Sequence, residues 1–303
     1  MKSLNKKLLL FLLIAVGFSV NGQRLEKAKD RFEVIQNDTN RVNLLIEKAD
    51  GYFFNRTDTC LFLVKQALAL AEELNYTNGE LRALNLAGES FRLLGDYPPA
   101  LEMQFRALEI NRKNQNKIGE AGTLGFIGFT YADLTEYRRA LDYLFKGKAI
   151  HTSIPNPVFS TFNLSNIGYA YEGLNLLDSA LYYQQAAQEK SASLPHKNLR
   201  ILTLSRLGII YSRLDQHEQA LSYYHQALQK AHEIEDRANL GRMQYRIALL
   251  YLKQHQNDSS LYYARLAYAN AGYTSQKAQI LASSNLLVQL KKKKNNSDSV
   301  IYY

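Results

Sequence analysis

The residues most able to do chemistry in this 303-residue chain are six histidines and a single cysteine, Cys60. The histidines are His151, His196, His217, His225, His232 and His255. None stands in the His-Glu-x-x-His spacing of a zinc-binding helix, and none is paired with Cys60. The sequence contains no Gly-x-Ser-x-Gly nucleophile elbow, no phosphate-binding loop and no Gly-x-Gly-x-x-Gly motif. It therefore predicts a protein that is not an enzyme, with no metal site and no cofactor.

A row of glycines points to binding or to close packing. Gly119, Gly122, Gly125 and Gly128 recur at every third residue. A glycine inside a helix costs about 1 kcal/mol relative to alanine, so Gly122 and Gly125 need an explanation. Two interpretations stay open. The glycines form a shallow floor that the backbone of a ligand approaches, or they reflect drift within a repeat and close helix packing.

The formal net charge is +9, but most of it lies in two short segments. Lys2, Lys6 and Lys7 stand near the N-terminus, and four lysines occupy residues 291–294. The rest of the chain is nearly balanced, so it does not carry the phosphate-neutralising surface that nucleic-acid binding needs. We expect no nucleic-acid partner.

The first residues read as an export signal. Three lysines precede an apolar run at residues 8–16, and Val20-Asn21-Gly22 offers a cleavage site. The apolar run is short for a membrane span, and no later stretch has the length and apolarity of one. We therefore expect a signal peptide at residues 1–22 and an exported protein, periplasmic or extracellular, with an uncleaved anchor as the alternative.

The chain that follows the N-terminal segment repeats every 40 residues, and this repeat must position any site. Within each unit, apolar residues recur at steps of three and four, a pattern that predicts two amphipathic helices joined by a short turn. The repeating columns are Gly88, Gly128, Gly168 and Gly208; Ala100, Ala140, Ala180 and Ala220; Leu44, Leu84, Leu124, Leu164 and Leu204; Tyr131, Tyr171, Tyr211 and Tyr251; Tyr143, Tyr183, Tyr223 and Tyr263. Cys60 falls in the alanine column, which favours a packed small residue.

These columns resemble the tetratricopeptide repeat (TPR). The fifth unit shows the pattern most clearly, with Leu207-Gly208, Tyr211, Ala220, Tyr224 and Ala227. A HEAT-like solenoid is the structural alternative, which the glycine, tyrosine and alanine columns argue against. The resemblance implies an all-α fold, a right-handed α-solenoid of about six helix-turn-helix units plus a partial seventh. We expect a lead-in helix at 23–40, the solenoid at 41–290, and a basic segment with the truncated start of a further helix at 291–303.

The same resemblance implies that a protein or peptide ligand binds in the concave groove. First-helix positions then supply the candidate site: Gly122, Gly125, Phe129, Phe162, Tyr169, Arg206, Ile209, Arg242, Tyr245 and Arg246. An aromatic section followed by a basic section suits an extended peptide with an apolar stretch and an acidic group. The alternative is that these arginines belong to a solvated helix face.

An export signal followed by 40-residue units is also similar to the N-terminal region of bacterial sensor and regulator proteins. That resemblance implies a membrane span and an output domain further along a longer natural protein. The columns continue to Tyr303 in the middle of a seventh unit, which favours a fragment over a degenerate cap. A sensing region of a signal-transduction protein and a free-standing periplasmic adaptor or assembly scaffold are the two functions that this sequence leaves open.

Overall fold

The computed structural model describes residues 39–53, 56–274 and 277–301, and every regular element among them is a helix. The helices are α3 (Thr39–Tyr52), α4 (Thr57–Glu73), α5 (Thr77–Leu93), α6 (Tyr97–Lys113), α7 (Lys117–Asp133), α8 (Tyr137–Ser153), α9 (Pro157–Gly173), α10 (Leu177–Ala192), α11 (Lys197–Arg213), α12 (His217–His232), α13 (Arg237–Lys253), α14 (Asn257–Thr274) and α15 (Lys277–Ile301). The all-α prediction is confirmed. The predicted signal peptide lies outside the described residues, as does all but the end of the predicted lead-in helix.

The helices follow the 40-residue period from α5 onward. Each odd-numbered helix from α7 to α15 begins forty residues after the one before it, and each from α5 to α13 packs against the even-numbered helix that follows it to form a unit. The first unit departs from this period, because α3 begins only 38 residues before α5. The predicted leucine column is therefore wrong there: Ile46 is buried at 4% exposure, and Leu44 is only half-buried.

Three-residue turns join most of the helices, and in most of them the middle residue adopts a left-handed conformation. Gly95 does so with φ 79°, and six other such turns place a residue other than glycine there, among them Asn75 and Thr135. These turns end the preceding helix with a backbone hydrogen bond: the N–H after the left-handed residue donates to the carbonyl five residues earlier, as from Tyr76 to Ala71. Pro155 and Pro195 occupy the corresponding turns before α9 and α11, where proline fixes a negative φ and ends the preceding helix.

The small-residue columns bring the two helices of a unit together. Ala140 and Ala180 are fully buried at the start of the second helices. A Cβ added to Gly128 would lie 2.5 Å from Leu144 Cγ, and one added to Gly168 would lie 3.2 Å from the carbonyl oxygen of Ala180. The glycine and alanine columns are therefore needed for the close approach of the helices, as the sequence predicts.

Stacked tyrosine pairs recur in four successive units and account for much of the tyrosine content. In each pair a tyrosine near the end of the first helix lies over one near the start of the second helix. The ring centroids are 5.3–5.7 Å apart, with interplanar angles of 5–23°, in the pairs Tyr131–Tyr143, Tyr171–Tyr183, Tyr211–Tyr223 and Tyr251–Tyr263. Such aromatic pairs add about 0.5–1.5 kcal/mol beyond the area they bury.

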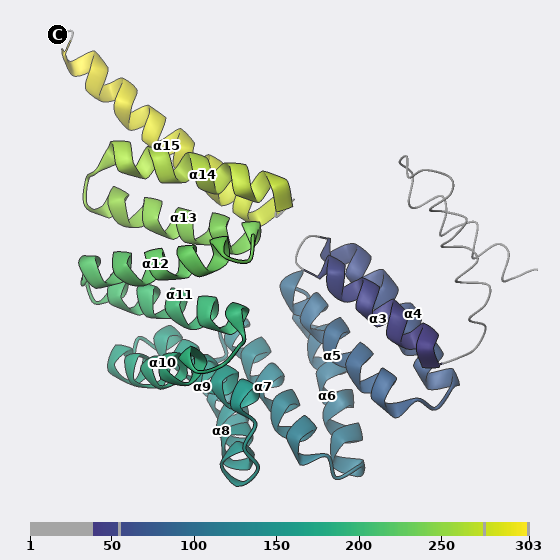
Figure 1. Ribbon diagram of the computed structural model, residues 1–303. Helices are drawn as coiled ribbons and strands as arrows, with labels where there is room; N and C mark the ends of the chain where they lie inside the picture. Colours follow the sequence, from purple (N-terminus) through teal and green to yellow (C-terminus); the bar gives the residue numbers. More distant parts are fainter. Residues whose placement is uncertain (1–38, 54–55, 275–276, 302–303) are drawn as a thin grey trace, which may run out of the picture.

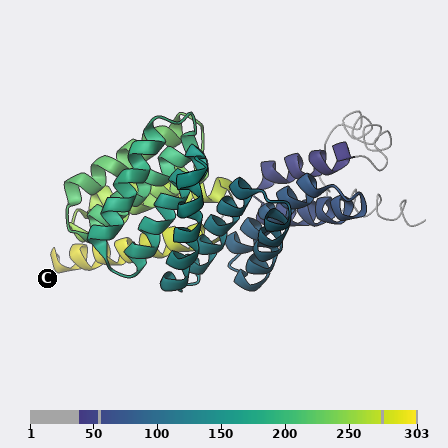
Figure 2. The same cartoon turned by 90° about the horizontal axis from the view of Figure 1, so that it is seen from below.

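The units curve so that their first helices line the inner side. First helices of successive units contact one another all along the array, whereas among the described residues no second helix contacts the second helix of the next unit. Figure 1 shows the result, an arc that runs from α3 and α4 through α7–α9 to α13 and α14. Figure 2 shows the same array from below. The inner side formed by α5, α7, α9, α11 and α13 is called the concave face below.

The last helix corrects the predicted organisation of residues 291–303. We expected a helix to end there and a new one to start, but α15 runs without a break from Lys277 to Ile301. A separate helix of a few residues would be too short to hold itself, and residues 297–301 keep their backbone hydrogen bonds by continuing α15. Leu286 and Leu290 of α15 are buried against Ala248 and Ala264.

Cys60 is a packed residue in this array. Its side chain is fully buried, its Sγ lies 3.3 Å from Ser90 Oγ, and burial raises the pKa of its thiol. We expect Cys60→Ala to lower the free energy of unfolding by no more than about 1.5 kcal/mol, because most other units carry alanine there. Chemical denaturation measures this. Full retention of stability together with loss of ligand binding would show instead that the Cys60 thiol takes part in binding.

Candidate functional site

Four of the ten predicted site residues form one aromatic and basic cluster on the concave face. Phe129 of α7 lies edge-on to Phe162 and Tyr169 of α9, with ring centroids 5.7 and 5.9 Å away. The guanidinium of Arg206, from α11, lies 5.3 Å from the Phe129 ring and 4.9 Å from the Tyr169 ring. Three consecutive first helices therefore supply one surface, as the 40-residue period predicts.

A second arginine, which was not predicted, completes the cluster. The guanidinium of Arg92, from α5, lies 4.0 Å from the centroid of the Phe129 ring. Phe129 thus carries cation–π contacts from two arginines that are 114 positions apart in the sequence. We call Arg92, Phe129, Phe162, Tyr169 and Arg206 the concave cluster.

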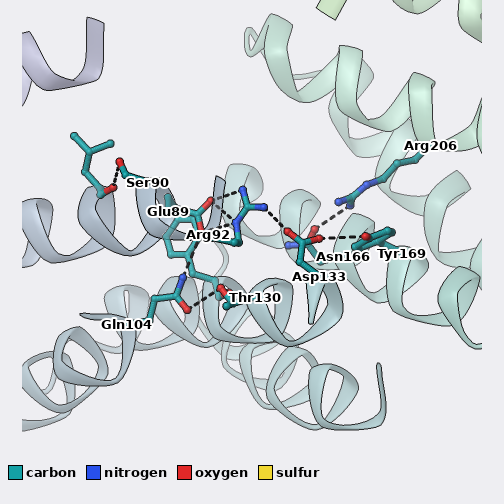
Figure 3. Close-up of polar contacts among 11 residues, drawn as sticks. Glu89, Ser90, Arg92, Gln104, Thr130, Asp133, Asn166, Tyr169 and Arg206 are labelled. Atoms are coloured by element: carbon teal, nitrogen blue, oxygen red, sulfur yellow. Dashed lines mark hydrogen bonds and ion pairs between the residues drawn. The ribbon is translucent and has the colours of Figure 1, made fainter. Parts of the chain in front are cut away.

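Carboxylates fix the position of Arg92 (Figure 3). Its guanidinium makes ion pairs with Glu89 of the same helix at 3.0 Å and with Asp133 of α7 at 2.5 Å. Tyr169 donates a hydrogen bond of 3.1 Å to the other oxygen of Asp133. Burial alone would lower the pKa of Arg92, but the two carboxylates outweigh it and raise that pKa, so Arg92 is always charged. Burial and the nearby Asp133 charge raise the pKa of Tyr169, which keeps its hydroxyl protonated.

Arg206 is held differently, by neutral acceptors. Its Nη1 donates to Ser165 Oγ at 2.7 Å and to Asn166 Oδ1 at 2.9 Å, and its side chain is almost fully buried. Burial lowers the pKa of Arg206 to about 10, so it stays charged at neutral pH. Within the described part of the chain, no carboxylate lies within ion-pair distance of Arg206. The cluster therefore contains a fixed cation with no direct ion-pair partner.

Buried glutamines of the second helices support both arginines from behind. Gln104 of α6 donates to Glu89 and accepts a 2.9 Å bond from Thr130, as Figure 3 shows. Gln184 of α10 accepts from Ser165, the residue that holds Arg206, and donates to the carbonyl of Thr203. Both glutamines are fully buried, so these bonds also satisfy groups that would be costly to leave unpaired.

The structure corrects the expected role of Gly122 and Gly125. Both are buried, and a Cβ at these positions would lie 3.5 Å from the Phe159 ring and 3.6 Å from Asn163 Nδ2. They face α9 and form no open floor, and α7 and α9 pack more extensively than any other described pair of first helices. This placement favours the second interpretation, drift within the repeat and close helix packing, over an open floor. Gly125→Arg would therefore overpack this contact, so it cannot serve as a selective block of a groove.

The remaining predicted residues lie further along the concave face. Ile209 and Tyr245 are half-buried and pack against apolar residues of their neighbourhood. Arg242 and Arg246 of α13 are exposed and have no ion-pair partner among the described residues.

Sequence reasoning missed Arg92 and Asp133, although a signal for them exists. Interacting polar residues on adjacent first helices recur at a separation of 41 positions, one more than the period. This spacing joins Arg92 to Asp133, Ser165 to Arg206, and Glu172 to Arg213. A search for complementary side chains at that separation finds all three contacts.

His151 gives this region a pH dependence. Its imidazole is buried at the end of α8, stacks on Phe159, and has no hydrogen-bond partner for either nitrogen in the described structure. Burial lowers its pKa, so the folded state takes up its proton at a lower pH than the unfolded chain, whose histidines titrate near 6.5.

The contribution of His151 to the free energy of unfolding should therefore be constant above about pH 7 and fall as the pH drops below about 6.5, by at most about 1.4 kcal/mol per pH unit. Unfolding curves at pH 7.5 and 5.5 test this, and the loss should shrink in His151→Leu. An equal loss in wild type and variant would assign it to other groups.

None of the described helices combines the length and the apolarity needed to cross a membrane. Among the described residues, no three of His, Cys, Asp or Glu gather closely enough to hold a metal ion.

Comparisons with known proteins agree with this architecture. Residues 199–271 match the tetratricopeptide repeat family model, which covers α11–α14. A search of curated proteins found no match. The chain is thus an all-α helical-repeat fold, and residues 199–271 are similar to the tetratricopeptide repeat.

Solved structures extend the similarity to most of the chain. The apo form of RapI is similar with a TM-score of 0.65 and 17% identity, over 83% of this chain and 90% of RapI. A Rap protein complexed with Competence and Sporulation Factor gives 0.65 and 13%, over 87% and 78%. NprR in complex with its cognate peptide NprX gives 0.62 and 15%, over 89% and 77%. At these identities the similarity shows the fold alone.

Proposed function

We propose that the protein is a non-catalytic binding module that holds a segment of a protein or an extended peptide on its concave face. The observation that carries the proposal is the concave cluster, in which Phe129, Phe162 and Tyr169 form an aromatic surface beside Arg206. Buried aromatic rings and arginines are the side chains that dominate protein recognition energetically. A similar fold holds a cognate peptide in NprR, and another is complexed with Competence and Sporulation Factor.

The charges on the concave face favour an acidic group on the ligand. Arg206, Arg242 and Arg246 occupy two adjacent first helices, α11 and α13, and none of them makes an ion pair with a described residue. The charge of Arg92, by contrast, is already paired with the carboxylates of Glu89 and Asp133. A ligand carboxylate beside the three unpaired arginines would be complementary to them, while its apolar residues pack on Phe129 and Phe162.

Charge reversal on α13 tests this proposal. We expect Arg242→Glu combined with Arg246→Glu to weaken capture of native partners by about tenfold or more, because it replaces attraction by repulsion toward an acidic ligand. Both side chains are exposed, so the fold should be unaffected. The measurement is affinity capture from the native cell envelope, with titration of each partner that wild type retains.

A matched control changes the net charge equally on the outer side. Arg138→Glu with Arg265→Glu alters exposed arginines of the second helices α8 and α14 and should leave capture unchanged. If both double variants fold and bind every partner as wild type does, the concave face is not the binding site.

We further propose that the protein is exported and that it serves as the sensing region of a signal-transduction protein. The residue order of the N-terminal segment supports export, and the similarity to Rap and NprR structures supports a regulatory role. N-terminal sequencing should find Gln23 first, and a retained Met1 on cytosolic protein would overturn export. A free-standing periplasmic adaptor is the alternative. A stretch of about 20 apolar residues encoded beyond Tyr303 would favour the sensor, and a stop codon there would favour the adaptor.

A further inference from the structure

A second candidate interaction surface lies on α15, the last described helix, at one end of the array (Figure 1). Leu281 and Val288 are 62% and 52% exposed there. They stand two helical turns apart, so they lie on one face of the helix, together with the exposed residues Ala278 and Asn285. We call Ala278, Leu281, Asn285 and Val288 the open face of α15.

In units three to six the corresponding face of the first helix is buried under the second helix of the same unit. A Cβ added to Gly128 of α7 would lie 3.0 Å from the carbonyl oxygen of Ala140 in α8, and Ser260 of α14 donates a 2.8 Å hydrogen bond to the carbonyl of Ala248 in α13. Among the described helices α15 contacts only α13 and α14. Its open face is therefore the side of a first helix that has no second helix on it. The buried counterparts of Leu281 are Ala121, Thr161, Ile201 and Gly241, and those of Val288 are Gly128, Gly168, Gly208 and Ala248.

Lysines stand at both ends of the open face. Lys291 and Lys292 are exposed and form no ion pair with any residue that the structure describes, and α15 begins at Lys277. These charges disfavour a second copy of the chain on this face. A symmetric antiparallel pair that set Leu281 against Val288 of the other copy would also set Lys277 opposite Lys292, because both pairs share one midpoint. Like charges placed there repel, whereas acidic residues in the same places attract.

We propose that the open face of α15 docks an amphipathic helix of a partner protein, one that has an apolar stripe with acidic residues at both ends. The partner helix lies where a second helix lies in the other units, antiparallel to α15, so its first turn comes near Lys291 and Lys292. Acidic residues in a first turn also stabilise the helix that carries them. Val288 is larger than the glycine or alanine of other units, so the partner helix needs a small residue opposite it. The proposal goes beyond the proposed function and does not rest on it, because no residue of the concave cluster takes part.

The experiment uses the full chain and two fluorescent synthetic peptides with the sequence of α14, the helix that covers the same face of α13. Asn257 begins α14, and near its other end the ring of Tyr273 lies 4.3 Å from the guanidinium of Arg237, the counterpart of Lys277. The acidic probe carries Asn257→Glu and Tyr273→Glu, and the basic probe carries Asn257→Lys and Tyr273→Lys. Fluorescence anisotropy measures binding at low ionic strength. We expect saturable binding of the acidic probe and binding about tenfold or more weaker for the basic probe, a difference that added salt reduces.

Two double variants of the full chain test the assigned residues. Leu281→Asp with Val288→Asp replaces the apolar contacts by carboxylates, and it should weaken binding of the acidic probe about tenfold or more. Leu94→Asp with Leu176→Asp makes the same change of net charge elsewhere on the array, at side chains that are 52% and 51% exposed, and it should bind the probe like wild type. All four side chains are exposed, so both variants should fold, and melting curves confirm it.

Equal binding of the two probes, wild-type binding by Leu281→Asp with Val288→Asp, or no saturable binding of the acidic probe would each overturn the docking surface. A wild-type dimer in sedimentation that this variant abolishes would also overturn it, because a second copy would then occupy the face. Binding to phosphatidylglycerol vesicles that the same variant abolishes would do so too, because lipid headgroups would then be the acidic partner. None of these measurements involves Phe129, Arg242 or Arg246, so their failure leaves the concave-face proposal to its own test.

Discussion

Replacing Gly168 by leucine should destabilise the array by about 1–3 kcal/mol or more. Gly168 is the point at which α9 meets α10: an added Cβ would already lie 3.2 Å from both the carbonyl oxygen of Ala180 and Gln184 Oε1. The remaining atoms of leucine have no space there, and Gln184 would lose its bonds with Ser165 and Thr203. Ala180→Phe should have an effect of the same size, because Ala180 is fully buried on the opposite side of the same contact.

Gly272→Leu is the matched control. No atom lies within 4 Å of a Cβ placed at Gly272, which is on an exposed position of α14. Leucine there should be neutral or slightly stabilising, since it favours helix more than glycine does. Thermal and denaturant unfolding of the three variants gives the comparison. Wild-type stability for both Gly168→Leu and Ala180→Phe would mean that the glycine and alanine columns are not the contact between the helices of a unit.

Arg92→Met should be the second strongly destabilising change, costing about 3–5 kcal/mol. Methionine fills a similar apolar volume but leaves the carboxylates of Glu89 and Asp133 without their shared cation. Both carboxylates are mostly buried, with side-chain exposures of 14% and 19%, so water compensates them poorly. Arg92→Lys should recover only part of the loss, because an ammonium group cannot bridge two carboxylates with the planar geometry of a guanidinium.

Arg139→Met provides the comparison for a surface ion pair. Arg139 pairs with Glu136 at 2.6 Å, but both side chains are largely exposed, and such pairs contribute about 0–1 kcal/mol. Denaturant unfolding of the two variants gives the difference in free energy of unfolding between losing a buried ion pair and losing an exposed one. If Arg92→Met cost no more than Arg139→Met, the Arg92–Asp133 contact would not be a link between the second and third units.

Residues with a repeated packing role could be predicted from the sequence, because the same constraint appears in every unit. Gly168, Ala180 and the stacked pair Tyr171–Tyr183 each have counterparts 40 residues away, so coincidence is excluded by repetition. The period also places Phe129, Phe162, Tyr169 and Arg206 on one face, and the structure brings these four together.

Features that occur at only one contact between units, with no counterpart elsewhere in the array, could not be predicted in the same way. Gly122 and Gly125 have no counterparts in other units, and only the packed structure shows that they face Phe159 and Asn163. The concave cluster needs Arg92 and Asp133, whose pairing crosses units at a separation offset from the period by one residue.

The central claim, that the ligand lies on the concave face, is tested most directly by site-specific photo-cross-linking. A photoreactive phenylalanine replaces Phe162 in the concave cluster or, in a separate variant, Tyr182, which is 68% exposed on α10. Each folded variant is irradiated with native cell extract, and the cross-linked products are identified. The account predicts one or more specific partners from position 162, lost on Arg242→Glu with Arg246→Glu, and none of them from position 182. Cross-links to the same partners from position 182 and not from position 162 would contradict it.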